Sequence, residues 1–259
     1  MSRAARAGFV LLLFIGLAVP LGAQDNAADW LKKMAERAAA GHYKFRFNAD
    51  VAMTQEGVQG GVKIDGSMNY VTAKRFRAGF NVDMDMGGMA MAMAMKTVSD
   101  GTTFWIEIDS PMLGGKQVMS GTTEQFEKLA EMSGADLSGL GGMGQDPIEQ
   151  ISALVEAFDL TVQGVEDGRV TLHATITPEQ LAASAQMAAL GEAIDSLTLV
   201  LDAKDGLPIR LTVAGEQPIM TIDFVDYEFF GADEVRDTDY TYTPPEGVTV
   251  TDIGSMLGS

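Results

Sequence analysis

Apolar and polar residues alternate with a period of two along much of the chain, most clearly in the stretch 80–95, F-N-V-D-M-D-M-G-G-M-A-M-A-M-A-M. Such alternation predicts half-buried β-strands. Gly87 and Gly88 fit the two-residue loop of a type I′ hairpin, because both central positions of that turn need a positive φ. The resulting register places all of the hairpin's large apolar side chains on one face: Phe80, Val82, Met84, Met86, Met89, Met91, Met93 and Met95.

This methionine face raises the main question about the chain. The opposite face carries Asn81, Asp83 and Asp85 across from alanines, and we expect it to face water. Leaving six methionine side chains exposed forgoes roughly 10 kcal/mol of burial, at about 1.5–3 kcal/mol each. That amount is comparable to the stability of a whole domain. Other groups must therefore cover the methionine face, and their identity is the functional question.

The same patterns predict the remaining elements. Helical spacing of apolar residues, with Asn26, Asp146 and a Thr177–Gln180 capping box at helix starts, predicts short helices at 26–40, 123–132, 147–158 and 178–190. A change of parity near Tyr227 predicts a β-bulge. Together the patterns predict an α+β, mainly β fold, in which about eleven strands form one antiparallel sheet curved into an unclosed half-barrel, with short helices over its concave face. The predicted strands cover 43–53, 62–70, 75–86, 89–99, 102–108, 160–165, 169–176, 197–201, 209–213 and 220–229, and 109–121 is a loop or a short strand.

The ends and the middle of the chain set the predicted domain organisation. Arg3 and Arg6, followed by an apolar run at 9–19 and by Leu-Gly-Ala at 21–23, are typical of a secretory signal peptide. We therefore expect a signal peptide at 1–23, a single domain at 24–259 and a soluble periplasmic protein. Residues 109–158, whose central part is rich in glycine, are a candidate helical lid.

Composition and charge exclude several classes of function. The chain has no cysteine and a formal net charge of −18, which argues against thiol chemistry and against binding to nucleic acid. The two histidines, His42 and His173, have no catalytic or metal-binding motif around them. Asp83, Asp85 and Asp100 lack the spacing of a calcium loop. We expect a monomer that is not an enzyme, with no catalytic residue, cofactor or metal.

Two short motifs resemble those of the periplasmic outer-membrane lipoprotein carriers, the LolA-like family. They are S-D-G-T-T-F-W at 99–105 and Y-T-P-P-E-G-V-T-V-T-D at 242–252. Lys74-Arg75 stands where that family has a K-R-P sequence, although Phe76 replaces the proline. The resemblance implies an unclosed barrel that binds lipoprotein acyl chains under a helical lid. It also implies that Arg75 holds the lid and acts in transfer, and that an inner-membrane donor and an outer-membrane acceptor are partners.

Three functions remain open from the sequence. The first is a carrier of lipid or lipoprotein acyl chains, for which methionines provide an adaptable apolar wall. The second is a periplasmic protein that binds Cu(I) through thioethers, and the third is a lipid-sensing regulator of the same fold. For the carrier, the predicted cavity is lined by Phe45, Phe47, Phe80, Val82, Met84, Met86, Met89, Met91, Met93, Met95 and Trp105.

Overall fold

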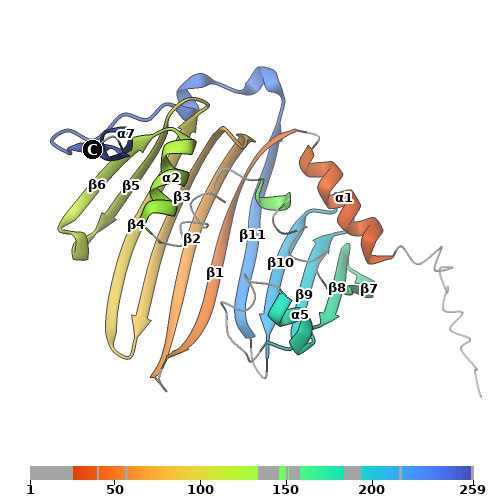
Figure 1. Cartoon of the computed structure of the whole chain (residues 1–259). Coiled ribbons are helices and arrows are strands. Elements are labelled where there is room, and N and C mark those ends of the chain that lie inside the picture. The colour runs from red at the N-terminus through yellow and green to blue at the C-terminus, as the bar shows by residue number, and fades with distance from the viewer. Residues whose placement is uncertain are drawn as a thin grey trace, which may run out of the picture.

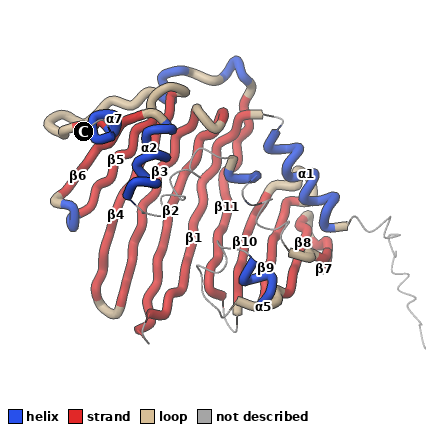
Figure 2. Tube along the Cα trace, viewed as in Figure 1, coloured by secondary structure: helices blue, strands red, loops and turns tan. Residues whose placement is uncertain are grey.

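A computed structural model gives the structure of residues 26–39, 41–55, 58–133, 146–149, 151, 158–183, 194–215 and 218–257. The predicted signal peptide at 1–23 lies outside these ranges, as do parts of the helices predicted at 147–158 and 178–190. Within them, the longest strands lie in the middle of the sheet and are flanked by shorter strands, with short helices packed on the sheet (Figures 1 and 2).

All described strands belong to one twelve-stranded sheet with the order β12-β6-β5-β4-β3-β2-β1-β11-β10-β9-β8-β7. Neighbours are antiparallel, except that β12 runs parallel to β6. The strands are β1 (His42–Gln55), β2 (Val58–Thr72), β3 (Arg75–Met86), β4 (Met89–Asp100), β5 (Phe104–Ser110), β6 (Gly115–Gly121), β7 (Thr161–Glu166), β8 (Arg169–Thr175), β9 (Ser196–Asp202), β10 (Pro208–Ala214), β11 (Pro218–Phe230) and β12 (Val250–Asp252).

The helices are short and lie mainly on one face of the sheet (Figure 1). We call this the helix face and the opposite one the outer face. On the helix face, α1 buries Trp30 and Met34 in the same core as Tyr43 of β1, and Phe126 of α2 meets Phe104 of β5 edge-on. The helices are α1 (Ala27–Ala39), α2 (Thr123–Ser133), α5 (Pro178–Ala183) and α7 (Ile253–Leu257), and the 3-10 turns are η1 (Pro111–Leu113), η3 (Ala232–Glu234) and η4 (Asp237–Tyr240).

The predicted helix starts are present as hydrogen bonds. The Asn26 side chain accepts a hydrogen bond from the backbone N–H of Asp29 at 2.9 Å. Thr177 and Gln180 form the predicted capping box, with each side chain accepting from the other residue's N–H. These caps satisfy amide groups that a helix leaves unpaired in its first turn.

The methionine hairpin has the predicted register. Met86 pairs with Met89, Met84 with Met91, Val82 with Met93 and Phe80 with Met95. Gly87 and Gly88 connect the strands with φ of 61° and 94°, as a type I′ turn requires. The predicted bulge is also present: the β1–β11 register shifts between Lys44 and Arg46, and Asp226 has a φ of 56°.

The predicted fold class is confirmed, because the sheet is single, curved and unclosed and carries short helices. Two elements extend the prediction. Residues 115–121, within the interval considered as a lid, form β6 and belong to the sheet. The three residues of β12 add a parallel strand next to β6. A strand of three residues is too short to be recognised from the alternation of apolar and polar residues.

Candidate functional site

The packed core on the helix face ends part of the way along the methionine hairpin. Phe80 and Met95 pack against the core cluster. The next two cross-strand pairs are Val82 with Met93 and Met84 with Met91. Their side chains lie on the same helix face but do not belong to that cluster. Met91 is 37% exposed, and the side chains of Val82, Met84 and Met93 are half-buried. We call these four residues the methionine shelf.

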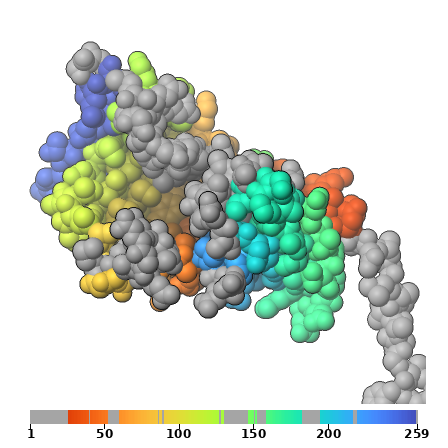
Figure 3. Space-filling model, turned by 60° about the horizontal axis from the view of Figure 1, so that its bottom comes forward, coloured from red at the N-terminus to blue at the C-terminus, as the bar shows by residue number. Residues whose placement is uncertain are grey.

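The shelf continues sideways onto neighbouring strands. Ile64 pairs with Val82 and with Ala49, so the row crosses β1, β2, β3 and β4 on the helix face. Figure 3 shows these strands, coloured orange to yellow, between the yellow-green β5 and β6 on one side and the green to cyan β7–β9 with α5 on the other. The side chains of Met86 and Met89, predicted to extend the same face, are outside what the structure describes.

An aromatic cluster adjoins the shelf. Phe47 lies between Phe45 and Phe80, with ring centroids 6.2 and 5.9 Å away. Gly66 of β2 pairs with both Phe47 and Phe80, and a Cβ there would lie 2.2 Å from Cζ of Phe47. Glycine at this position therefore lets the Phe47 ring lie flat on the sheet. The structure thus brings together the predicted residues Phe45, Phe47, Phe80 and Met95 with the shelf.

Polar groups are buried within this apolar region. Tyr43 is fully buried, and its hydroxyl donates a hydrogen bond to Oδ1 of Asp146, which is 6% exposed. The same carboxyl oxygen accepts the backbone N–H of Ile148 at 2.8 Å, so Asp146 joins the start of a helical segment to β1. Burial, followed by the charge of Asp146, raises the pKa of Tyr43 far above its usual value. The pattern of the sequence indicated the helix cap but not its partner in β1.

A second tyrosine in the same region has no such partner. The hydroxyl of Tyr227 is buried and has no hydrogen-bond partner among the described residues, and its ring stacks on Phe45 at 5.2 Å. Burial, followed by the charge of Asp146, raises the pKa of Tyr227 well above 10. The hydroxyl is therefore protonated and is able to donate a hydrogen bond inside the aromatic cluster.

The prediction that Trp105 lines the same cavity is wrong. Trp105 pairs with Val98 on the outer face, whereas its neighbours Phe104 and Ile106 are in the core on the helix face. Its indole packs with Tyr242, 6.0 Å between ring centroids, in a separate small cluster that includes Val98 and Val118. The sequence held a signal for this, because Trp105 shares its strand parity with Glu107 and Asp109.

The two motifs that carry the family resemblance therefore meet on the outer face. Residues 231–250, which we call the strap, follow β11 and run along one end of the sheet toward β12 (Figure 1). The hydroxyl of Tyr242 donates to Glu107 at 2.6 Å and that of Tyr240 donates to Asn69 at 2.7 Å. Burial raises the pKa of Glu107, but hydrogen bonds from Lys116 and Tyr242 and nearby positive charges outweigh it and leave this pKa below its usual value.

Arg75, predicted to act in the lid and in transfer, also contacts the strap. Its guanidinium forms an ion pair with Asp237 and lies 4.9 Å from the centre of the Tyr240 ring. Arg75 is on the outer face, because its parity is that of Arg77, which pairs with Val98. Both of these partners belong to η4 of the strap.

The two histidines each lie within hydrogen-bond distance of a neighbouring oxygen atom. Nδ1 of His173 is 3.1 Å from Oγ1 of Thr198, and Nδ1 of His42 is 3.3 Å from the carbonyl of Val71. Across the described ranges, no three His, Asp or Glu side chains are grouped so that they could hold a metal ion. Of the helices that the structure describes, none has the length and apolarity needed to cross a membrane.

Comparison with known proteins gives likeness only at the level of structure. No protein-family model matches the chain, and no curated protein matches it. Similar solved structures include LprF from Mycobacterium bovis, 14% identical with a TM-score of 0.45 over 86% of this chain and 99% of that one. A putative outer membrane lipoprotein-sorting protein domain from Vibrio parahaemolyticus is 10% identical, with a TM-score of 0.30 over 81% and 95%. The MucA/MucB complex of Pseudomonas aeruginosa contains a chain that is 15% identical, with a TM-score of 0.37 over 83% of this chain and 60% of that one.

The arrangement of strands and helices defines the class of fold. It is one curved, unclosed sheet with short helices on one face and, at one end of the other face, the strap.

Proposed function

We propose that the protein binds the acyl chains of lipids or lipoproteins on the helix face of its sheet and carries them through the periplasm toward the outer membrane. The observation that carries this proposal is the methionine shelf, an apolar surface that continues past the packed core. Exposed apolar surface of this kind marks a binding site in a soluble protein. We propose that the wall of the acyl-chain site consists of the predicted cavity residues other than Trp105, namely Phe45, Phe47, Phe80, Val82, Met84, Met86, Met89, Met91, Met93 and Met95.

The energetics favour an acyl chain as the occupant. A saturated chain of sixteen carbons gains on the order of 10 kcal/mol on burial, at about 0.8 kcal/mol per CH₂. Methionine side chains are unbranched and flexible, so they adapt to tails of different length and shape. The Tyr227 hydroxyl, buried beside Phe45 with no partner in the described chain, offers a hydrogen-bond donor to an ester or amide carbonyl at the head of such a chain.

The proposal is for a carrier without catalysis, and it includes a donor protein at the inner membrane and an acceptor at the outer membrane. Export by the signal peptide predicted at 1–23 and the resemblance of the two motifs support this location. The net charge of −18 suits a protein that stays dissolved and avoids anionic membrane surfaces between the two steps.

A pair of glutamate substitutions on adjacent residues tests the proposal. Met91→Glu places a carboxylate on the shelf, where burial against an acyl chain without a partner costs several kcal/mol. We expect it to abolish binding of a fluorescent fatty acid, measured by titration. Ala92→Glu is the matched control, because Ala92 pairs with Asp83 on the outer face and is exposed. Equal binding of the probe by the two variants would refute the shelf as the wall of the site.

One observation favours Cu(I) as a second candidate ligand. Met84 and Met91 are directly paired across the hairpin, and the next pair adds Met93 on the same face. Directly opposed residues have Cβ atoms only about 5 Å apart, and thioethers select Cu(I). A variant with Met84, Met86, Met89 and Met91 changed to leucine keeps the apolar face and removes the thioethers of the two directly opposed methionine pairs.

If the shelf serves lipid, this leucine variant binds Cu(I) as weakly as the unchanged protein in a competition titration and still binds the fatty acid. Tight stoichiometric Cu(I) binding that disappears in the leucine variant would instead assign the shelf to copper.

A further inference from the structure

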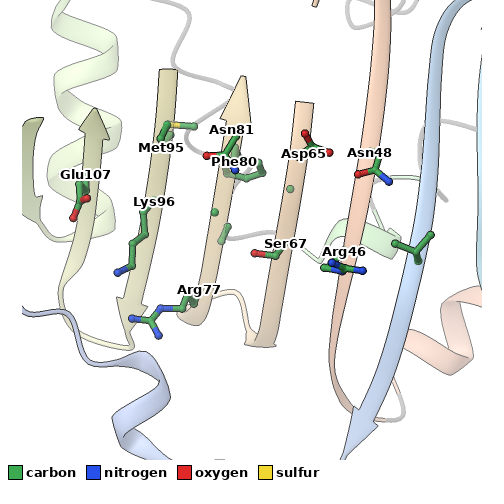
Figure 4. Close-up of a pocket in the computed structure, with 15 residues that line it drawn as sticks. Arg46, Asn48, Asp65, Ser67, Arg77, Phe80, Asn81, Met95, Lys96 and Glu107 are labelled. Carbon is green, nitrogen blue, oxygen red and sulfur yellow. The ribbon is translucent and has the colours of Figure 1, made fainter. Parts of the chain in front are cut away.

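A second candidate site lies on the outer face, behind the core. A hollow of about 750 Å³ crosses the middle of the sheet there (Figure 4). Its floor is one row of paired residues, in which Arg46 pairs with Ser67, Ser67 with Gly79 and Gly79 with Lys96. Neighbouring strands are about 4.8 Å apart, so Arg46 and Lys96 start about 14 Å from each other across a floor of small residues.

The hollow is more basic than the rest of this acidic protein. Arg46, Arg77 and Lys96 surround its floor (Figure 4). Arg46 is paired with Asp226, its Nε lying 2.7 Å from Oδ2. Within the described chain, neither Arg77 nor Lys96 has a carboxylate at ion-pair distance; Lys96 instead lies 5.3 Å from the centre of the Tyr242 ring.

The acidic residues of the hollow do not cancel this charge. Glu107 is engaged by Lys116, 2.7 Å away, and by the Tyr242 hydroxyl. Asp65 is the other carboxylate at the rim, and it lies on the side away from Arg77, next to Asn48 and Asn81 (Figure 4). The lining therefore holds three cations and two carboxylates, and Lys96 is near enough to Glu107 for its charge to help lower the pKa of that carboxyl.

Arg77 gives an independent sign that a group is missing from this hollow. Its Nε–H is buried and has no hydrogen-bond partner in the part of the chain that the structure describes. A buried donor without a partner costs free energy, more so when it belongs to a charged group. An anion seated beside Arg77 would supply the acceptor that this Nε–H lacks in the described chain.

Gly79 points to the same conclusion. A glycine in the interior of a central strand weakens it and often marks a place where a ligand approaches closely. Neither a positive φ nor a bulge explains Gly79, since its register is continuous on both sides. Its missing Cβ would meet only Oγ of Ser67, at an ordinary 3.5 Å. By contrast, Gly66 of the neighbouring strand β2 is explained by the Phe47 ring.

We propose that this outer-face hollow binds the phosphate group of a small hydroxylated molecule, with Arg77 and Lys96 holding the phosphate over Gly79. Two cations that have no carboxylate at ion-pair distance in the described chain match the double charge of a phosphate better than the single charge of a carboxylate. Ser67, Asn48, Asn81 and Asp65 provide hydroxyl, amide and carboxylate groups for the hydroxyls of the same molecule. The chemistry fits both free phosphate and a glycerol phosphate headgroup. The site is separated from the methionine shelf by the sheet itself, so it stands or fails independently of the carrier function.

Isothermal titration of the full mature chain with inorganic phosphate, glycerol 3-phosphate and glycerol tests the proposal, with the backbone amide of Gly79 followed by NMR. We expect both phosphates to bind saturably and glycerol not to bind. If glycerol 3-phosphate binds more tightly than inorganic phosphate, the ligand of the hollow is a glycerol phosphate headgroup. If the two bind equally tightly, the ligand is free phosphate.

Four variants make the test specific. Arg77→Gln and Lys96→Gln should each weaken phosphate binding about tenfold, as expected for loss of one charged hydrogen-bond partner. Gly79→Val keeps every charge but fills the floor, and it should also weaken binding by tenfold or more. Lys63→Gln removes the same charge on the same face outside the hollow, and should bind as the unchanged protein does.

The proposal is overturned if neither phosphate binds saturably, if Lys63→Gln weakens binding as much as Lys96→Gln, or if Gly79→Val binds normally. Circular dichroism and thermal unfolding of each variant establish that the sheet is intact. Should Lys96→Gln disturb the strap through Tyr242, Gly79→Val still decides the question, because Gly79 has no side chain and a Cβ there would meet only Oγ of Ser67.

Discussion

The hydrogen bond between Tyr43 and Asp146 makes a quantitative prediction about how the helical segment beginning at 147 is held to the sheet. Tyr43→Phe removes only the hydroxyl, and Tyr43 is fully buried, so the ring keeps its packing and leaves almost no cavity. Hydrogen bonds to charged groups contribute about 1.5–3 kcal/mol. We expect Tyr43→Phe to lower the free energy of unfolding by this amount in urea denaturation.

Asp146 variants separate the two functions of the carboxyl group. Asp146→Asn keeps an oxygen that caps the helix and accepts from Tyr43, so it should have a smaller effect, about 1 kcal/mol. Asp146→Ala loses the cap at Ile148 and also leaves the Tyr43 hydroxyl buried without a partner, and should have the largest effect. In a double-mutant cycle, Tyr43→Phe should then add little to Asp146→Ala. A loss below about 0.5 kcal/mol in Tyr43→Phe would contradict this reasoning, because a buried charged hydrogen bond would be worth no more than an exposed one.

Two further predictions concern the aromatic cluster. Gly66→Ala would place Cβ 2.2 Å from the Phe47 ring, so we expect the ring to be displaced. The free energy of unfolding, measured by urea denaturation, should fall by about 1–3 kcal/mol, and fatty-acid binding should weaken. Unchanged stability would show that the ring moves freely. Burial, followed by the charges of Asp146 and Glu149, raises the pKa of Tyr70 to about 12 from its ordinary value of 10.0. As the pH rises, the unfolded chain releases this proton at a lower pH than the folded chain does. The free energy of unfolding should therefore fall between about pH 10 and 12, and that of the Tyr70→Phe variant should fall less steeply over the same range.

The sequence was most informative where alternation and turn chemistry agree. The methionine hairpin needed no long-range information, because Gly87-Gly88 determines the turn and the period of two determines the register. The bulge near Asp226 was visible as a change of parity between Phe224 and Tyr227. The Thr177 capping box was visible for the same local reason.

Long-range contacts could not be obtained in this way. Asp146 was predicted as a helix cap, but its hydrogen bond to Tyr43 joins residues 103 positions apart. Trp105 was assigned to the wrong face because it was treated as a large apolar residue without regard to the parity of Phe104 and Ile106. Arg46, Arg77 and Lys96 come from three strands, so the outer-face hollow exists only once the sheet is assembled.

The lengths of the strands at the two rims of the sheet bear on how the molecule behaves at high concentration. A sheet that does not close has two rims, and a long flat rim is a template for pairing with another molecule. Here the long strands, β1 to β4 and β11, lie inside, and the rims are formed by the three residues of β12 and the six of β7. β12 passes directly into α7, and the pairing of β7 with β8 shifts between Val162 and Gly164. Both rims are thus short and irregular, which disfavours edge pairing with a strand from a second copy.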